Sequence, residues 1–292
     1  MRRLIIAITG LATLAAAVFT APAATAAAQD LETSVYSGIV APGGTQHRWW
    51  NNANPLSVSY TVGLSPRGAS ISASCQFEVV SEWYQQNLGG EREYHYIIKN
   101  VGTISCGTDI HLYSLDDIAG FWNTGALSPG QTTSKHWNNA NPHNLAYVPG
   151  LSPNGATTSG PCKMEITRTW YVEQPGGERE FWFDVKNTGT VACVADVLLG
   201  SRSTVTMFGT GTKVPGQSTT VPHNNANPLA AAYVVGFAPD GATLTTPCKF
   251  QLTRSWYLQR INADGSVERE FHQTYQNIGS ITCSAVRLLA TA

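Results

Sequence analysis

Histidine is the side chain most often used for proton transfer near neutral pH, and this chain of 292 residues has seven. They are scattered, and only His95 and His272 stand at matching positions of an internal repeat. No G-x-S-x-G, H-E-x-x-H or phosphate-binding pattern occurs. We therefore expect the histidines to be surface residues with no catalytic or metal-binding role, and the chain not to be an enzyme.

Paired carboxylates are a second kind of catalytic group, and three Glu-Arg-Glu triplets begin at Glu91, Glu178 and Glu268. Two acids flanking a sugar bond carry out glycoside hydrolysis. Neighbouring residues of a strand point to opposite faces, so Glu91 and Glu93 share one face while the arginine between them points away. The pattern, which follows a hairpin connection each time, favours a solvated cross-strand charge patch over a pair of catalytic acids.

The most distinctive polar segment, Asn-Asn-Ala-Asn-Pro, occurs three times and follows Trp50, Trp137 and His223. Asparagine tolerates left-handed backbone and Asn-Pro starts turns, so one interpretation is a rigid corner between two strands. The other is a binding loop, in which amides bond to sugar hydroxyls and the preceding ring stacks on the apolar face of the sugar. Its candidate ligand-binding residues are Trp50, Asn51, Asn52 and Asn54 in the first copy, Trp137, Asn138, Asn139 and Asn141 in the second, and His223, Asn224, Asn225 and Asn227 in the third.

These segments belong to three copies of one module, offset by 87 and 86 residues. Each copy repeats a Pro-Gly pair, a Pro-x-Gly-Ala turn, a Trp-Tyr pair, the Glu-Arg-Glu triplet and an Asn-x-Gly step in the same order. We place the modules at residues 31–115, 116–201 and 202–292. No Pro-rich or Gly/Ser-rich linker separates them, so we expect them to abut, either in a line or around a threefold axis.

Each module carries one pair of cysteines, and the partners are 31, 31 and 35 residues apart. No closely spaced Cys or His residues suggest a zinc site. The simplest pairing stays within the modules and joins Cys75 to Cys106, Cys162 to Cys193, and Cys248 to Cys283. Each bridge closes a loop, which the chain-entropy relation values at roughly 3–4 kcal/mol. We predict three disulfides and no metal or cofactor.

After the first cysteine of each module, side chains alternate as in a half-buried strand. In the second module one parity, which we assign to the core, holds Cys162, Met164, Ile166 and Trp170. The next segment alternates in the same way beyond a hairpin connection. The opposite parity exposes a second candidate binding surface, unless its members pack between modules: Tyr84, Tyr171 and Tyr257.

With strands before and after the Asn-rich segment, each module has about six or seven strands and no helix, which suits an antiparallel sandwich of immunoglobulin-like size. The run Val-Lys-Asn-Thr-Gly-Thr at 185–190, followed by a strand of small residues, resembles bacterial immunoglobulin-like adhesion and stalk modules. We therefore predict an all-β chain of three tandem, disulfide-bonded, immunoglobulin-like β-sandwich modules.

Residues 1–28 have the features of a secretory signal peptide: Arg2 and Arg3, an apolar stretch from Leu4 to Phe19, and Ala-x-Ala cleavage signals. The apolar stretch is short for a membrane span. We expect cleavage to leave Ala27 or Gln29 as the first residue, and the product to be secreted.

Charged residues make up 13% of the chain and the formal net charge is −1. Binding to nucleic acid needs clustered Lys and Arg, so we expect no nucleic-acid partner. We predict a secreted, non-enzymatic, multivalent binding or adhesion protein, because three weak sites gain avidity on a repetitive polysaccharide or cell-wall surface. A structural or protein-interaction protein, such as an inhibitor of secreted hydrolases, is the alternative, and a hydrolase is the third.

Overall fold

The computed structural model describes residues 30–53, 57–138, 140, 145–226 and 232–292. The expected signal peptide lies outside them. The described residues form seventeen strands and no helix, so the all-β class is confirmed. No helix among them is long and apolar enough to cross a membrane.

The strands follow the sequence repeat in three sets. The first set holds β1 (Asp30–Tyr36), β2 (Thr45–Asn51), β3 (Ser59–Arg67), β4 (Cys75–Gln86), β5 (Arg92–Asn100) and β6 (Gly107–Leu115). The second holds β7 (Ile118–Asn123), β8 (Thr132–Trp137), β9 (Leu145–Asn154), β10 (Cys162–Glu173), β11 (Arg179–Asn187) and β12 (Val194–Gly209). The third holds β13 (Ser218–Asn224), β14 (Tyr233–Asp240), β15 (Cys248–Ile261), β16 (Val267–Asn277) and β17 (Ser284–Thr291), and its first strand is the end of β12.

Each set makes two antiparallel groups of three strands. In the first repeat these are β1-β6-β3 and β2-β5-β4, and the other repeats have the same order. The immunoglobulin-like arrangement is not confirmed. There the first two strands are neighbours in one sheet, whereas β1 and β2 lie in different sheets here. The first strand pairs instead with the last.

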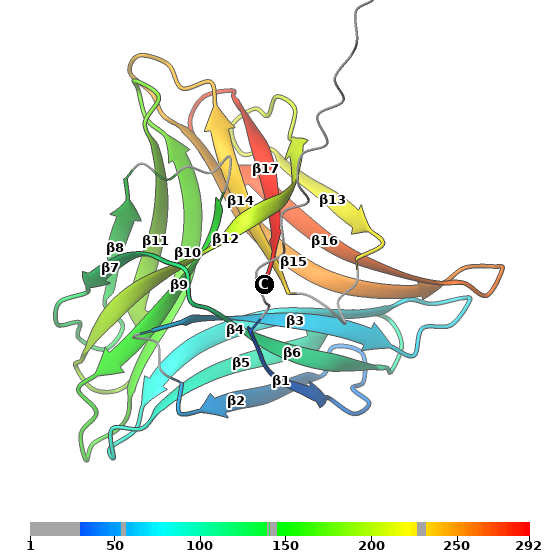
Figure 1. Cartoon of the computed structure of the whole chain (residues 1–292), viewed down its shortest axis with the longest axis horizontal. Helices are drawn as coiled ribbons and strands as arrows, with labels where there is room; N and C mark the ends of the chain where they lie inside the picture. The colour runs from blue at the N-terminus through cyan, green and yellow to red at the C-terminus, as the bar shows by residue number, and fades with distance from the viewer. Residues whose placement is uncertain (1–29, 54–56, 139, 141–144, 227–231) are drawn as a thin grey trace, which may run out of the picture.

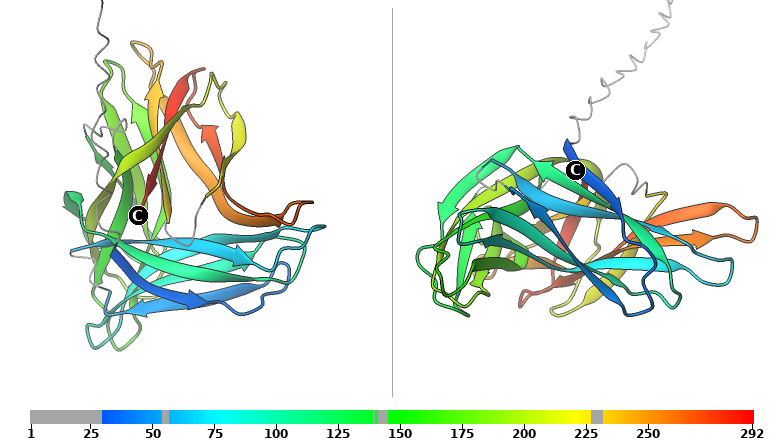
Figure 2. Two further views of the ribbon diagram at one scale, coloured as in Figure 1. Left: turned by 45° about the vertical axis from the view of Figure 1, so that its right-hand side comes forward. Right: turned by 90° about the horizontal axis from the view of Figure 1, so that it is seen from below.

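The three repeats close into a ring, which resolves the choice between a line and a threefold arrangement. The end of β4 pairs with the start of β10, the end of β10 with the start of β15, and the end of β15 with the start of β4. Figures 1 and 2 show three groups of strands, coloured blue to teal, green, and yellow to red, that meet around one centre. A pseudo-threefold axis therefore passes between β4, β10 and β15.

A side chain at or near the end of each of these strands hydrogen-bonds to the next repeat. Gln86 Oε1 accepts the N–H groups of Gly155 and Ala156 at 2.9 and 3.2 Å. The equivalent bonds run from Ala242 N–H to Glu173 Oε2 at 2.8 Å and from Ala69 N–H to Gln259 Oε1 at 3.2 Å. Because buried amides need partners, these bonds fix each repeat against the next.

The three predicted disulfides are confirmed, with Cα–Cα distances of 6.0, 5.9 and 6.0 Å for Cys75–Cys106, Cys162–Cys193 and Cys248–Cys283. Each joins the start of the fourth strand of a repeat to the segment before its last strand. The two strand groups of a repeat are thus linked across the core. The cysteines are buried and belong to one hydrophobic core that extends over all three repeats.

Candidate functional site

A β-bulge in the fourth strand of each repeat decides which side chains face outward. The register shifts between Val79 and Ser81 in β4, with equivalent shifts in β10 and β15. One extra residue on a strand reverses its side-chain alternation. The assignment of Trp170 to the core side is therefore wrong, since it lies beyond the bulge and faces outward while Tyr171 is buried.

The outward tryptophans head three cross-strand rows, which we call the outer rows. Their members oppose one another in register on the fourth, fifth and second strands of a repeat. The first outer row is Trp83, His95 and Trp49, the second is Trp170, Trp182 and His136, and the third is Trp256, His272 and Pro222. The tryptophan and its neighbour are stacked in all three, with ring centroids 4.9, 5.6 and 4.9 Å apart.

A cation covers the inner end of each row. Lys163 Nζ lies 4.0 Å from the Trp83 ring, and the guanidinium carbons of Arg168 and Arg254 lie 4.6 and 4.8 Å from their tryptophan rings. Cations are attracted to the negative faces of such rings. The open end of each row is therefore at the edge strand, where Trp49 is 55% exposed and His136 and Pro222 are also exposed.

The last glutamate of each Glu-Arg-Glu triplet holds the middle ring of the row. Glu93 Oε2 lies 2.9 Å from His95 Nε2, Trp182 Nε1 donates to Glu180 Oε2 at 2.6 Å, and Glu270 Oε2 lies 2.6 Å from His272 Nε2. The predicted solvated charge patch is wrong here, because Glu180 and Glu270 are buried. A carboxylate paired with a ring N–H sets the orientation of that ring.

The arginines of the first two triplets hydrogen-bond to the neighbouring repeat. Arg92 Nε donates to Pro153 O and Arg179 Nε donates to Pro239 O, both at 3.2 Å and both across a repeat boundary. The sequence placed these side chains opposite the glutamates, but it gave no sign of what they contact. In the first two repeats the triplet thus joins one repeat to the next and positions a ring of the outer row.

A second histidine, His47, packs against the first outer row and pairs with His95. His47 Nε2 lies 3.0 Å from His95 Nδ1, and the His47 ring is stacked on Trp83. Both contacts of His95 are satisfied when His47 donates to it and it donates to Glu93. Burial lowers the pKa of His95, and Glu93 opposes this shift. The expectation that the histidines lie at the surface is wrong for His95 and His111, which are buried; His143 lies outside the described residues.

The structure divides the predicted Asn-rich sites between two faces. Asn51, Asn138 and Asn224 are exposed, and each follows the exposed end of an outer row by two residues, so it lies on the same face of its strand. Asn52 and Asn225 have φ of 54°, the left-handed backbone that the corner interpretation expects. Asn54, Asn139, Asn141 and Asn227 lie outside the described residues.

The predicted stacking rings point the other way. Trp50 and Trp137 pack against the hydrophobic core, and His223 is partly buried against Tyr233. The alanine of each Asn-rich segment is buried behind them. A hollow of about 330 Å³ nevertheless brings Trp137 and Asn138 together with Trp122 and His136 in the second repeat. The exposed polar side of the segment is therefore its first asparagine, beside the end of the outer row.

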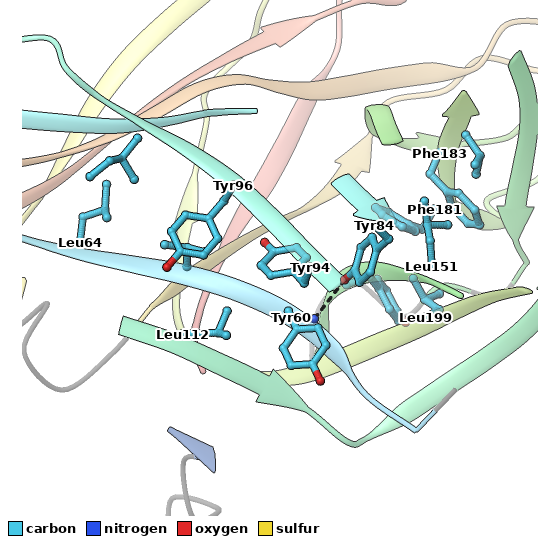
Figure 3. Close-up of a cluster of buried hydrophobic side chains, with 14 of the residues drawn as sticks. Tyr60, Leu64, Tyr84, Tyr94, Tyr96, Leu112, Leu151, Phe181, Phe183 and Leu199 are labelled. Carbon is cyan, nitrogen blue, oxygen red and sulfur yellow. Dashed lines mark hydrogen bonds between the residues drawn. The ribbon is translucent and has the colours of Figure 1, made fainter. Parts of the chain in front are cut away.

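A cavity of about 390 Å³ lies on the pseudo-threefold axis, and we call it the axial cavity. Its walls hold six tyrosines and one phenylalanine from all three repeats: Tyr60, Tyr84, Tyr94, Tyr147, Tyr233, Tyr257 and Phe271. The proposed exposed surface at Tyr84, Tyr171 and Tyr257 is wrong, because all three are buried. The backbone N–H of Tyr60 donates to the Tyr84 hydroxyl at 3.3 Å (Figure 3), and the other repeats have the same bond.

One ionisable acid faces the axial cavity. Glu82 lies on β4 beyond the bulge, and its side chain is exposed to the cavity rather than packed in the core. The Tyr94 hydroxyl donates to Glu82 Oε1. Burial raises the pKa of this carboxyl, and the bond from Tyr94 opposes the shift. Burial also raises the pKa of Tyr84 and Tyr94, so their hydroxyls stay protonated.

Known proteins offer no further guide to either site. No protein-family description, no curated protein and no solved structure matches this chain. Among the residues that the structure describes, no group of three His, Cys, Asp or Glu side chains is placed to hold a metal ion. The outer rows and the axial cavity are therefore the candidate sites among the residues that the structure describes.

Proposed function

We propose that this is a secreted, non-enzymatic protein that binds polysaccharide or cell-wall glycan through its three outer rows. One observation carries the proposal: a similar construction recurs on every repeat, namely an exposed side chain at the edge strand (Trp49, His136 or Pro222), a stacked pair of rings behind it, a carboxylate on the middle ring and an exposed asparagine beside the open end. Residues that recur around an axis at the surface favour multivalent binding over a single reaction centre.

The chemistry of a row suits a sugar. A pyranose has an apolar face that packs on a flat ring, and a rim of hydroxyls that bonds to amides and carboxylates. In the first repeat Trp49 offers the ring and Asn51 the amide. His136 with Asn138, and Pro222 with Asn224, stand in the same places in the other repeats. The exposed end differs between repeats, so we expect the three sites to bind one glycan class with unequal strength.

Secretion is part of the proposal. It rests on the signal-like residues 1–28, and three disulfides among the described residues are compatible with an oxidising environment. The buried cysteines and the closed ring of repeats would keep such a protein folded outside the cell. Secretion from an expressing cell, followed by N-terminal sequencing of the product, tests the predicted cleavage before Ala27 or Gln29.

The test of binding compares two triple variants on an array of polysaccharides. Trp49→Ala/His136→Ala/Pro222→Ala removes the open end of every row. Thr45→Ala/Thr132→Ala/Ser218→Ala changes three exposed positions at the far end of the same strands and serves as the matched control. We expect the wild type and the control to be retained on a shared set of glycans and the first variant to be lost from it. Equal retention of both variants would contradict the proposal.

A further inference from the structure

The axial cavity departs from threefold symmetry at one acidic position. Glu82 occupies a position that is Thr169 in the second repeat and Ser255 in the third, and all three line the cavity. Tyr94, which bonds to Glu82, is replaced by Phe181 and Phe271 at the matching positions. The acid and its hydroxyl donor thus occur together, once, at the point where the three repeats meet. This pairing has no part in the outer rows.

Glu82 has no positively charged partner. None of the ion pairs among the residues that the structure describes involves it. Arg168, the arginine of the cavity wall, is exposed and covers the Trp170 ring. The protein around the cavity disfavours the ionised form of this carboxyl and raises its pKa, and no ion pair offsets that cost. A cation bound in the cavity would supply the positive charge that Glu82 lacks.

The walls around Glu82 are suited to a cation that carries alkyl groups. Tyr60, Tyr84 and Tyr94 form one cluster, with centroid distances between 5.0 and 6.4 Å. Tyr233, Tyr257 and Phe271 form the equivalent cluster across the axis, with distances between 4.8 and 6.2 Å. Aromatic walls attract ammonium groups and exclude the water that would compete for them. The cavity of about 390 Å³ is within the range of small-molecule sites.

We propose that the axial cavity binds one small organic cation, a protonated or quaternary amine, with Glu82 as its counter-ion and the tyrosine clusters as its walls. The stoichiometry is one per chain, in contrast to the three outer rows. Metal ions are a poorer fit, because Glu82 is a single carboxylate among rings. The proposal does not depend on glycan binding, since neither Glu82 nor the tyrosine clusters belong to an outer row.

Binding should depend on pH in one direction. The charged and titratable groups that face the cavity are Glu82 from β4, Arg168 from β10, and the tyrosines of β3, β4, β5, β9, β14 and β15. The arginine remains charged, and the tyrosine hydroxyls remain neutral, across the accessible range. Protonation of Glu82 removes the counter-charge, so affinity for a cation falls as the pH drops through the raised pKa of that carboxyl.

Calorimetric titration of the whole mature chain tests the proposal with two probes of one shape, choline and its uncharged isostere 3,3-dimethylbutan-1-ol. We expect choline to bind once per chain and at least about tenfold more tightly than the isostere at pH 8, with the difference lost in acid. Equal affinity for the two probes, or no binding of choline, would overturn the proposal.

Variants separate the role of the carboxyl from the shape of the cavity. Glu82→Gln should lose choline by about tenfold or more and leave the isostere unchanged, while Glu91→Gln, the same change on an exposed hairpin, should change neither. Tyr94→Phe places the residue of the other two repeats in the first and should fold normally. Because it removes the donor to Glu82, it should move the pH midpoint of choline binding upward. An unchanged midpoint, or choline affinity unaffected by Glu82→Gln, would contradict the assignment.

Discussion

The outer rows and the axial cavity lie on opposite faces of the same three strands, and they differ in how well they repeat. Each outer row has a tryptophan at its head and a glutamate on its middle ring. The cavity has one acid and two hydroxyl side chains at the equivalent places. Off-axis positions are far apart and can each hold a complete site. On the axis the three positions share one space, where three carboxylates would repel one another.

A residue that recurs in all three repeats therefore indicates a candidate site only away from the axis. At the surface, the same residue in all three repeats gives three separate copies of one site. Repeating a charged residue three times on the axis would bring like charges together and destabilise the ring. The outer rows are therefore expected to act together on one large partner, and the cavity to act alone on a small one.

The largest expected effect comes from reducing the number of outer rows. Removing the exposed ends one, two and three at a time should weaken binding to an immobilised polysaccharide by on the order of a hundredfold in total, because each loss also removes avidity. Binding of a short soluble oligosaccharide should fall only in proportion to the number of sites left. Surface-based and solution titrations of the same variants compare the two. Parallel losses in both assays would show that the rows act independently.

The first and third rows differ in how deeply the head tryptophan lies. Trp83 is 7% exposed beneath His47, whereas Trp256 is partly exposed. Trp83→Ala should lower the free energy of unfolding by about 3 kcal/mol, and Trp256→Ala by less. Urea denaturation followed by circular dichroism measures both. A larger loss at Trp256 would mean that the third row carries more of the packing than its burial suggests.

The first row should lose stability in acid. The pKa of His95 is lowered in the folded state by burial, so the unfolded chain binds more protons near pH 6, and stability falls as the pH drops below the ordinary histidine value of about 6.5. His95→Gln should flatten this part of the pH profile. Thermal unfolding of both proteins between pH 5 and 8 provides the measurement, and identical slopes would contradict it.

Glu82 in the axial cavity should change the pH dependence of stability in the opposite direction from His95, and this effect should be the smallest of the four. The pKa of Glu82 is raised in the folded state, so the folded chain binds more protons and stability falls as the pH rises above about 4.5. Glu82→Thr, which copies the second repeat, should therefore raise the midpoint of thermal unfolding more at pH 8 than at pH 4. A benefit that is equal at both pH values would mean that volume rather than charge is responsible.

Much of the fold, but less of the candidate sites, could be predicted from the sequence. The repeat, the disulfide pairing and the strands after each first cysteine follow from columns of residues at fixed offsets. The place of Trp170 could not be predicted, because nothing in the sequence marks the extra residue of a bulge, which reverses the alternation only once the strands pair. The glutamates of the triplets were expected to be solvated because alternation shows which residues share a face but not how deeply that face is covered.

The sequence by itself determined that three β-rich units, each with its own disulfide, occur in one chain. Local patterns suffice for that, because turns, alternation and cysteine spacing act within a few tens of residues. The tertiary structure decided that the units close into a ring, since this depends on edges of β4, β10 and β15 that meet only in space. It alone created the axial cavity. The outer rows belong to both, because their residues recur in the sequence but face outward only once the bulges are in place.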